Sequence, residues 1–193
     1  MAGDRRRRGC YPRSMPVQIG VRPHSAADPT GLMSDCHRRI EMFLAALERA
    51  GQALERPADC TLRDGLAAAL RYFREAAPKH NADEEASLFP RLRATGSAEA
   101  AEALALLERL EREHRWADPL HATVDALGEK YLAHGPLPAA EAARFRAAVA
   151  ELRAMYGEHI GLEDQVVFPL AVRLLSPEAK AEVTREMAAR RTA

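Results

Sequence analysis

Two short segments of the chain repeat one pattern of chemically active residues. The first places His80 and Glu84 four residues apart, shortly before a Phe-Pro pair. The second repeats this order with His159 and Glu163, at a constant offset of 79 positions. Because residues four apart lie on one face of an α-helix, each segment would aim an imidazole and a carboxylate in the same direction. Two such helices facing each other could enclose a pair of metal ions.

Two further histidines complete a possible ligand set. His37 and His114 each fall in the apolar stripe of an expected helix, 77 positions apart. This spacing nearly matches the offset of the repeated segments, which predicts a doubled helix hairpin with pseudo-twofold symmetry. The candidate metal ligands are therefore four imidazoles and two carboxylates, namely His37, His80, Glu84, His114, His159 and Glu163.

These donors favour particular metals. The set lacks the thiolates that favour Cu(I) or structural zinc, and it is too rich in imidazole for calcium or magnesium. Iron or manganese in octahedral geometry fits, with two imidazoles on each ion. Glu84 and Glu163 would bridge the two ions, which an oxo or hydroxo group would also join. Open coordination positions would remain for a small molecule, and Fe/Fe, Fe/Mn and Mn/Mn pairs share these ligands.

The same residues have simpler interpretations. A lone histidine on an apolar helix face is more often a core or surface residue than a ligand. A His-Glu pair four residues apart can be an ordinary polar pair on an exposed face. Here, however, both pairs fall on apolar stripes, where a carboxylate without a partner is costly to bury. Cations would satisfy such a cluster, so the pattern favours a metal site.

Long helices must position these residues. Ala and Leu dominate the apolar residues, and Val and Ile are few, which favours helix over sheet. We expect an all-α fold, an antiparallel up-down four-helix bundle with an additional C-terminal helix. The expected helices run from 30 or 34 to near 54, from 61 to 93, from 97 to before 135, from 138 to 175, and onward from 176.

Local signals refine these helices. Ser34 and Asp35 offer N-cap chemistry for the first helix. Pro78 and Pro119 lie inside the second and third helices, where each is expected to interrupt the backbone hydrogen bonds.

The remaining organisation follows from composition. Residues 1–29 are expected to form a flexible basic tail, with Met15 as a possible true start, and residues 30–193 the bundle. Lys plus Arg and Asp plus Glu balance at 28 each, which predicts no nucleic-acid partner. No apolar run approaches the ~18 residues of a membrane span. Three cysteines without CxxC spacing predict no disulfide framework and a cytoplasmic location.

The sequence resembles the hemerythrin-like, HHE cation-binding domain family over about residues 30–190. The order and spacing of the six candidate ligands carry the resemblance, together with Leu88-Phe89-Pro90 and Val167-Phe168-Pro169. The resemblance implies a nonheme diiron site inside a four-helix bundle, with those six residues as its ligands.

Differences from parts of the family are also informative. Oxygen-carrying hemerythrins usually have a further histidine one turn after the third-helix ligand, where this chain has Asp118. The chain resembles instead the branch with four histidines and two glutamates, some members of which carry a glutamate where this chain has Asn81. The N-terminal cysteine motif of related iron-sulfur repair proteins is absent.

Several neighbours of the expected site have two interpretations. Asp118 could be an extra ligand, being four residues after His114. His121 could transfer protons or line a polar channel. Tyr156 could hydrogen-bond a bound oxygen species or be a core tyrosine.

Three residues adjoin expected ligands in the sequence. Cys36 could be a buried thiol or a redox-sensing one. Glu85 and Asp164 are expected to face solvent or to accept hydrogen bonds from ligand imidazoles.

Four functions compete at this stage. The first is a module that binds or senses dioxygen, nitric oxide or peroxide at a diiron centre. The alternatives are a diiron enzyme that reduces peroxide or activates oxygen, an iron-handling protein, and a helical interaction bundle without metal. No catalytic residue and no protein partner can be assigned from the sequence.

Overall fold

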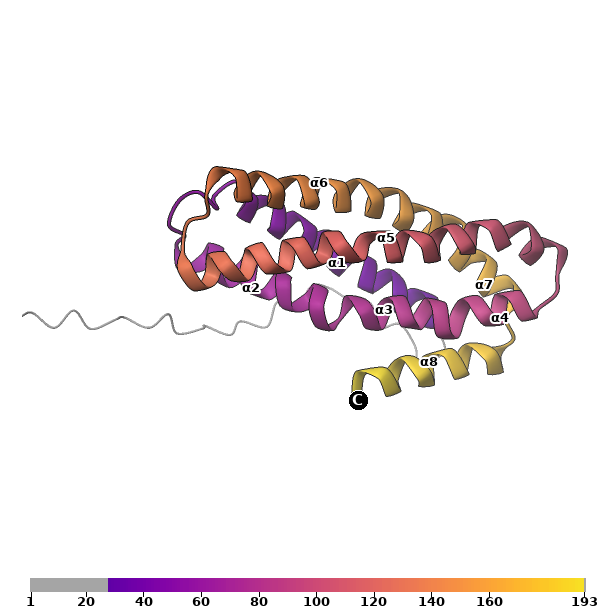
Figure 1. The fold of residues 1–193 in the computed structure, drawn as a ribbon. Coiled ribbons are helices and arrows are strands. Elements are labelled where there is room, and N and C mark those ends of the chain that lie inside the picture. The colour runs from indigo at the N-terminus through magenta and orange to yellow at the C-terminus, as the bar shows by residue number, and fades with distance from the viewer. Residues whose placement is uncertain (1–27, 193) are drawn as a thin grey trace, which may run out of the picture.

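The computed structural model describes residues 28–192, and within this range the chain is helical and contains no strand. Four long helical segments lie antiparallel in a bundle, and a shorter C-terminal helix packs beside them (Figure 1). The predicted all-α bundle with an additional C-terminal helix is therefore confirmed. The division into a tail at 1–29 and a bundle at 30–193 stays a prediction, because residues 1–27, with Met15, lie outside the described range.

The first and third long segments are single helices, and the second and fourth are each divided into several helical pieces. The first is α1 (Pro29–Gly51). The second comprises α2 (Cys60–Glu75), α3 (Ala77–Asp83), the π-helical turn η1 (Glu84–Leu88) and α4 (Phe89–Ala94). The third is the single helix α5 (Ala98–His134). The fourth comprises α6 (Ala139–Leu162), the π-helical turn η2 (Glu163–Val167) and α7 (Phe168–Leu174), and α8 (Pro177–Thr192) follows it.

The start of α1 is set by Asp28 and Pro29. The Asp28 carboxylate accepts a hydrogen bond from the Gly31 amide at 2.9 Å, and Pro29 occupies the first helical position. The prediction that Ser34 caps this helix is wrong. Ser34 lies one turn inside α1 and donates its hydroxyl hydrogen to Asp164 at 2.7 Å.

The two prolines inside predicted helices behave differently. A turn at Ala76 separates α2 from α3, and Pro78 is the second residue of α3, so this helix is interrupted where the sequence predicted. The predicted interruption at Pro119 is wrong, because α5 continues through it. Pro119 and Arg115, whose carbonyl loses its donor, are both exposed, so water can satisfy that carbonyl.

Two apolar clusters fill the bundle. One includes Leu44, Leu70 and Phe145, and the other includes Met33 and Phe89. Each long segment contributes residues to both clusters, and buried polar residues lie between these contributions along the chain. The bundle therefore contains a polar layer enclosed between two apolar ones.

Two observations bear on the predictions about location. Cys36 is a buried free thiol, and the prediction of no disulfide framework stays a prediction, because Cys10 lies outside the described range. Among the described helices, none combines the length and the apolar character that a membrane crossing requires.

Candidate metal centre

All six predicted ligands converge in the polar layer. They come from all four long segments, and each is at most 5% exposed. The four histidines lie on α1, α3, α5 and α6, and the two glutamates open the turns η1 and η2: His37, His80, His114, His159, Glu84 and Glu163.

Both glutamates stand at the first residue of a π-helical turn. In η1 the amide of Phe89 donates to the carbonyl of Glu84, and in η2 the amide of Phe168 donates to that of Glu163. A proline follows each phenylalanine. Because proline lacks an N–H and its ring crowds the carbonyl four residues earlier, the helix widens just before it. The repeated Phe-Pro pair thus accounts for the wide turn on which each carboxylate sits.

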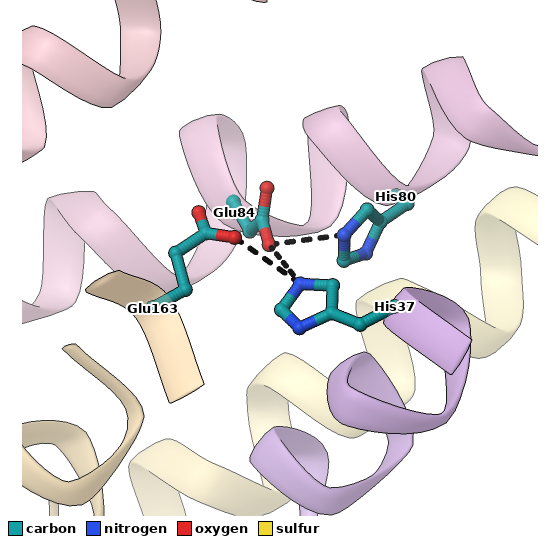
Figure 2. A group of neighbouring side chains, drawn as sticks. All are labelled: His37, His80, Glu84 and Glu163. Atoms are coloured by element: carbon teal, nitrogen blue, oxygen red, sulfur yellow. Dashed lines mark ion pairs between the residues drawn. The ribbon is translucent and has the colours of Figure 1, made fainter. Parts of the chain in front are cut away.

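The six side chains form two groups that share both glutamates. In each group, one donor atom from every residue lies within 4.8 Å of the others. The first group is His37, His80, Glu84 and Glu163 (Figure 2), and the second is Glu84, His114, His159 and Glu163.

Glu84 turns a different oxygen toward each group. Its Oε1 lies 3.2 Å from Nε2 of His80 and 3.8 Å from Nε2 of His37, as the dashed lines in Figure 2 indicate. Its Oε2 lies 3.5 Å from Nε2 of His114.

Glu163 repeats this arrangement. Its Oε2 lies 3.1 Å from Nε2 of His37, and its Oε1 lies 3.3 Å from Nε2 of His159. Each carboxylate therefore presents one oxygen to each of the two groups.

The site contains buried polar atoms without hydrogen-bond partners, and cations would compensate them. All four oxygens of Glu84 and Glu163 are buried and receive no well-formed hydrogen bond from the described residues. Burying such carboxylates without compensation is costly. Nε2 of His114 lies 3.0 Å from Nε2 of His159. Two neighbouring ligands of one octahedral ion, with bonds of about 2.1 Å, would also lie about 3.0 Å apart.

Three of the four imidazoles are held from outside by a carboxylate. Since an ionised carboxylate only accepts, each Nδ1–H donates to it, which turns Nε2 inward. The pairs are His37 with Asp164 (3.0 Å), His114 with Glu85 (2.7 Å), and His159 with Glu113 (2.9 Å).

Two of these outer carboxylates were anticipated and one was not. Glu85 and Asp164 directly follow the inner glutamates, and of the two expectations stated for them, hydrogen bonding to imidazoles is confirmed. Glu113 was missed, because its role depends on how α5 docks against α6 rather than on any spacing within the sequence.

His80 is the exception among the imidazoles. Its Nδ1 is buried and has no hydrogen bond to any described residue. His80 corresponds to His159 in the other half of the pseudo-symmetric bundle. His159 is held by Glu113, the residue just before His114. The residue just before His37 is Cys36, so a thiol occupies the position where symmetry would place a carboxylate for His80.

Without a cation, protons compensate part of this charge. Burial acts to lower the pKa of His37, but the hydrogen bond to Asp164 and the nearby carboxylates of the inner glutamates raise it to about 11. Burial is likewise outweighed at His159, where Glu163 raises the pKa to about 9. Burial and the charge of Glu163 raise the pKa of Glu84 to about 8. At Glu163, burial is opposed by both imidazoles, which together lower its pKa.

The remaining predicted neighbours lie outside both groups. Asp118 is exposed on α5 and belongs to neither group. Tyr156 is a buried core tyrosine whose hydroxyl lies 3.0 Å from Nε2 of His121. The His121 ring stacks on Phe73 with centroids 4.9 Å apart, and burial lowers its pKa to about 4. The Tyr156 ring lies 6.0 Å from that of His159, so this pair borders the centre.

Comparison with known families agrees with this geometry. A family model described as "Hemerythrin HHE cation binding domain" matches residues 28–171. The matched range contains all six inward residues and ends within α7, before α8 begins. No curated protein gives a significant match to the chain.

Proposed function

Because the chain belongs to the hemerythrin HHE cation-binding family, we propose that its six inward residues hold two iron ions. The observation that carries this proposal is the orientation of Glu84 and Glu163, each of which offers one oxygen to either histidine pair. An iron-manganese pair is the alternative, since both metals accept the same nitrogen and oxygen donors.

We propose further that the centre binds or senses dioxygen, nitric oxide or peroxide. The six residues offer about eight donor atoms, whereas two octahedral ions have about twelve positions, so room remains for an added ligand. The flanking apolar clusters favour a small, uncharged one. When bound, the ion pair supplies one-electron redox chemistry and Lewis acidity toward such ligands.

The protein's own side chains prepare this site. The outer carboxylates fix three imidazoles with Nε2 inward. Phe168 stacks on the His37 ring, with centroids 5.2 Å apart and planes within 13°, and so limits its rotation. The ligands are therefore arranged before any ion arrives, which lowers the reorganisation needed on binding.

An enzymatic role is the second candidate. The observation that favours it is the buried Tyr156, hydrogen-bonded to His121 beside His159, because a hydroxyl there could assist peroxide reduction or oxygen activation. An iron-handling role is a third candidate. A cytoplasmic location and the lack of nucleic-acid and membrane partners stay predictions from composition.

The first test is metal content, followed by reactivity. We expect about two irons per chain and near-ultraviolet charge-transfer bands, both lost in a His80→Ala, His159→Ala variant. The reduced, iron-loaded protein would then be mixed rapidly with dioxygen, nitric oxide or peroxide. A stable adduct supports binding or sensing, repeated turnover supports the enzyme, and iron release supports iron handling. Folded protein that takes up no iron on anaerobic reconstitution contradicts the proposal.

A further inference from the structure

The C-terminal helix α8 is attached to the turn that carries Glu84. It lies beyond the family match and packs against α1, α3 and η1, along the outside of the bundle (Figure 1). Its buried residues Val183 and Met187 join the apolar cluster that contains Phe89.

Two consecutive arginines of α8 reach one buried carboxylate. Nη1 of Arg190 lies 2.8 Å from Oδ1 of Asp83, and Nη2 of Arg191 lies 2.6 Å from its Oδ2. Asp83 is fully buried and directly precedes Glu84. Both carboxylate oxygens of Asp83 are thus neutralised by residues of a helix more than 100 positions away in the sequence.

The Arg190 guanidinium also reaches Ser87, within the η1 turn. Nη2 of Arg190 donates to Oγ of Ser87 at 2.7 Å, and the Ser87 hydroxyl donates to Glu186. Arg91 donates to the Ser87 carbonyl at 3.0 Å and to Glu186 at 2.8 Å. Arg190 therefore links Asp83, the last residue of α3, to Ser87 within the π-helical turn, and Glu84 lies between them in the chain.

Among the described residues, this attachment exists in one half of the pseudo-symmetric site and not in the other. At the offset of 79, the counterparts of Asp83 and Ser87 are Leu162 and Val166, which carry no polar side-chain atom. A π-helical turn is rare and has less favourable hydrogen-bond geometry than an α-helix. A polar bridge across such a turn restricts the backbone on which the Glu84 carboxylate is carried.

We propose that Arg190 and Arg191 are positioning residues for the metal centre. Through Asp83 and Ser87 they hold the η1 turn in the form that points the two oxygens of Glu84 toward different histidine pairs. The inference rests on the proposed metal binding at Glu84, and it makes α8, outside the matched domain, a functional part of this protein.

The test uses the full chain with Arg190→Ala and Arg191→Ala together. Iron release from the Fe(II)-loaded protein to a chromophoric chelator is followed without oxygen, and amide hydrogen exchange is followed in the metal-free protein. We expect release to be at least about tenfold faster, the size usual for losing groups that orient a ligand. Amides of residues 84–88 should exchange faster, while those of residues 163–167 should not.

Two single variants separate positioning from general stability. Arg185→Ala removes an exposed arginine of the same helix that lies 3.7 Å from Glu182 and forms no ion pair with Asp83 or other residues in the described range, and it should behave like the parent. Val183→Ala loosens the buried face of α8 without touching Asp83, and shows how far lost stability alone speeds release.

A third change covers the case in which the double variant is too unstable to study. Adding Asp83→Asn removes the unpaired buried charge and should restore stability, but not the bridge across the turn. Iron release that stays fast in this triple variant, although its stability is restored, supports the proposal. Release that follows stability alone, or parent-like release and exchange, overturns it while the proposed function stands. A parent chain that binds no iron overturns both.

Discussion

Glu113 on α5 holds the imidazole of His159 on α6, with 2.9 Å between Oε2 and Nδ1. The contact turns Nε2 of His159 toward Glu163, 3.3 Å away. The other oxygen of Glu113 accepts a hydrogen bond from Arg109 at 2.6 Å, so the carboxylate is itself fixed. Glu113, which is not part of the repeated His-Glu motif, thereby orients His159, which is part of it.

We predict that Glu113→Gln weakens metal binding by about tenfold or more, because the neutral amide supports the imidazole less strongly than a carboxylate. Competition with a chelator of known affinity measures the change. Glu158→Gln is the matched control, since the exposed Glu158 also contacts Arg109, at 3.0 Å, but does not hold His159. Equal losses in both variants would indicate a general charge effect instead.

The two ion positions should differ in affinity. His114 and His159 both have an outer carboxylate, whereas His80 has none among the described residues. We therefore expect the first equivalent of a diamagnetic ion such as Zn(II) to shift the ring resonances of His114 and His159 more than those of His37 and His80. Equal shifts of all four rings would contradict this order of filling.

Metal binding should release protons and strengthen as pH rises. The raised pKa values of His37 and His159, about 11 and about 9, mean that both imidazoles hold a proton at pH 7 in the metal-free protein. The pKa of Glu84, about 8, means that it is also largely protonated there. Since an ion must displace these protons, apparent affinity should increase from pH 6 to pH 9.

Calorimetry in buffers of different ionisation enthalpy tests this directly. Proton release appears as a dependence of the observed heat on the buffer. Heats that do not depend on the buffer, with affinity constant across this range, would show that the raised pKa values are incorrect.

Pro90→Ala should separate metal binding from stability. Alanine restores the missing backbone donor and lets the η1 turn relax toward a regular α-helix, which moves Glu84 away from its bridging position. We expect the unfolding free energy of the metal-free protein to be unchanged or higher, and the metal affinity to fall at least about tenfold.

Pro119→Ala is the control for that substitution, because it makes the same chemical change at an exposed position inside α5. Chemical denaturation and chelator competition should show no loss of metal binding there. Comparable losses for Pro90→Ala and Pro119→Ala would argue against the role given to the π-helical turn.

Much of the site could be predicted because its candidate ligands recur at short, fixed spacings in the sequence. The four-residue step from His80 to Glu84, its repetition at His159 and Glu163, and their apolar surroundings depend only on helical periodicity. The structure brings these residues together with His37 and His114 as expected. The same periodicity predicted the four long segments of the bundle and the helix that follows them.

What escaped prediction depends on how helices dock. Ser34 looked like a helix cap but reaches Asp164 across the bundle. No role for Asp83 was predicted from the sequence, yet it is buried, and α8 supplies two arginines to it. The continuity of α5 through Pro119 depends on which side of the helix faces water. None of these outcomes follows from the identity of nearby residues alone.

The enclosure of the polar layer between two apolar clusters has a consequence for how the protein acquires its metal. In a metal-loaded form of this protein, an ion would have to give up its hydration shell to enter this layer and regain it to leave. Ion exchange would then be slower than at a protein surface. An ion that is abundant while the bundle assembles would therefore have an advantage over competitors that arrive later.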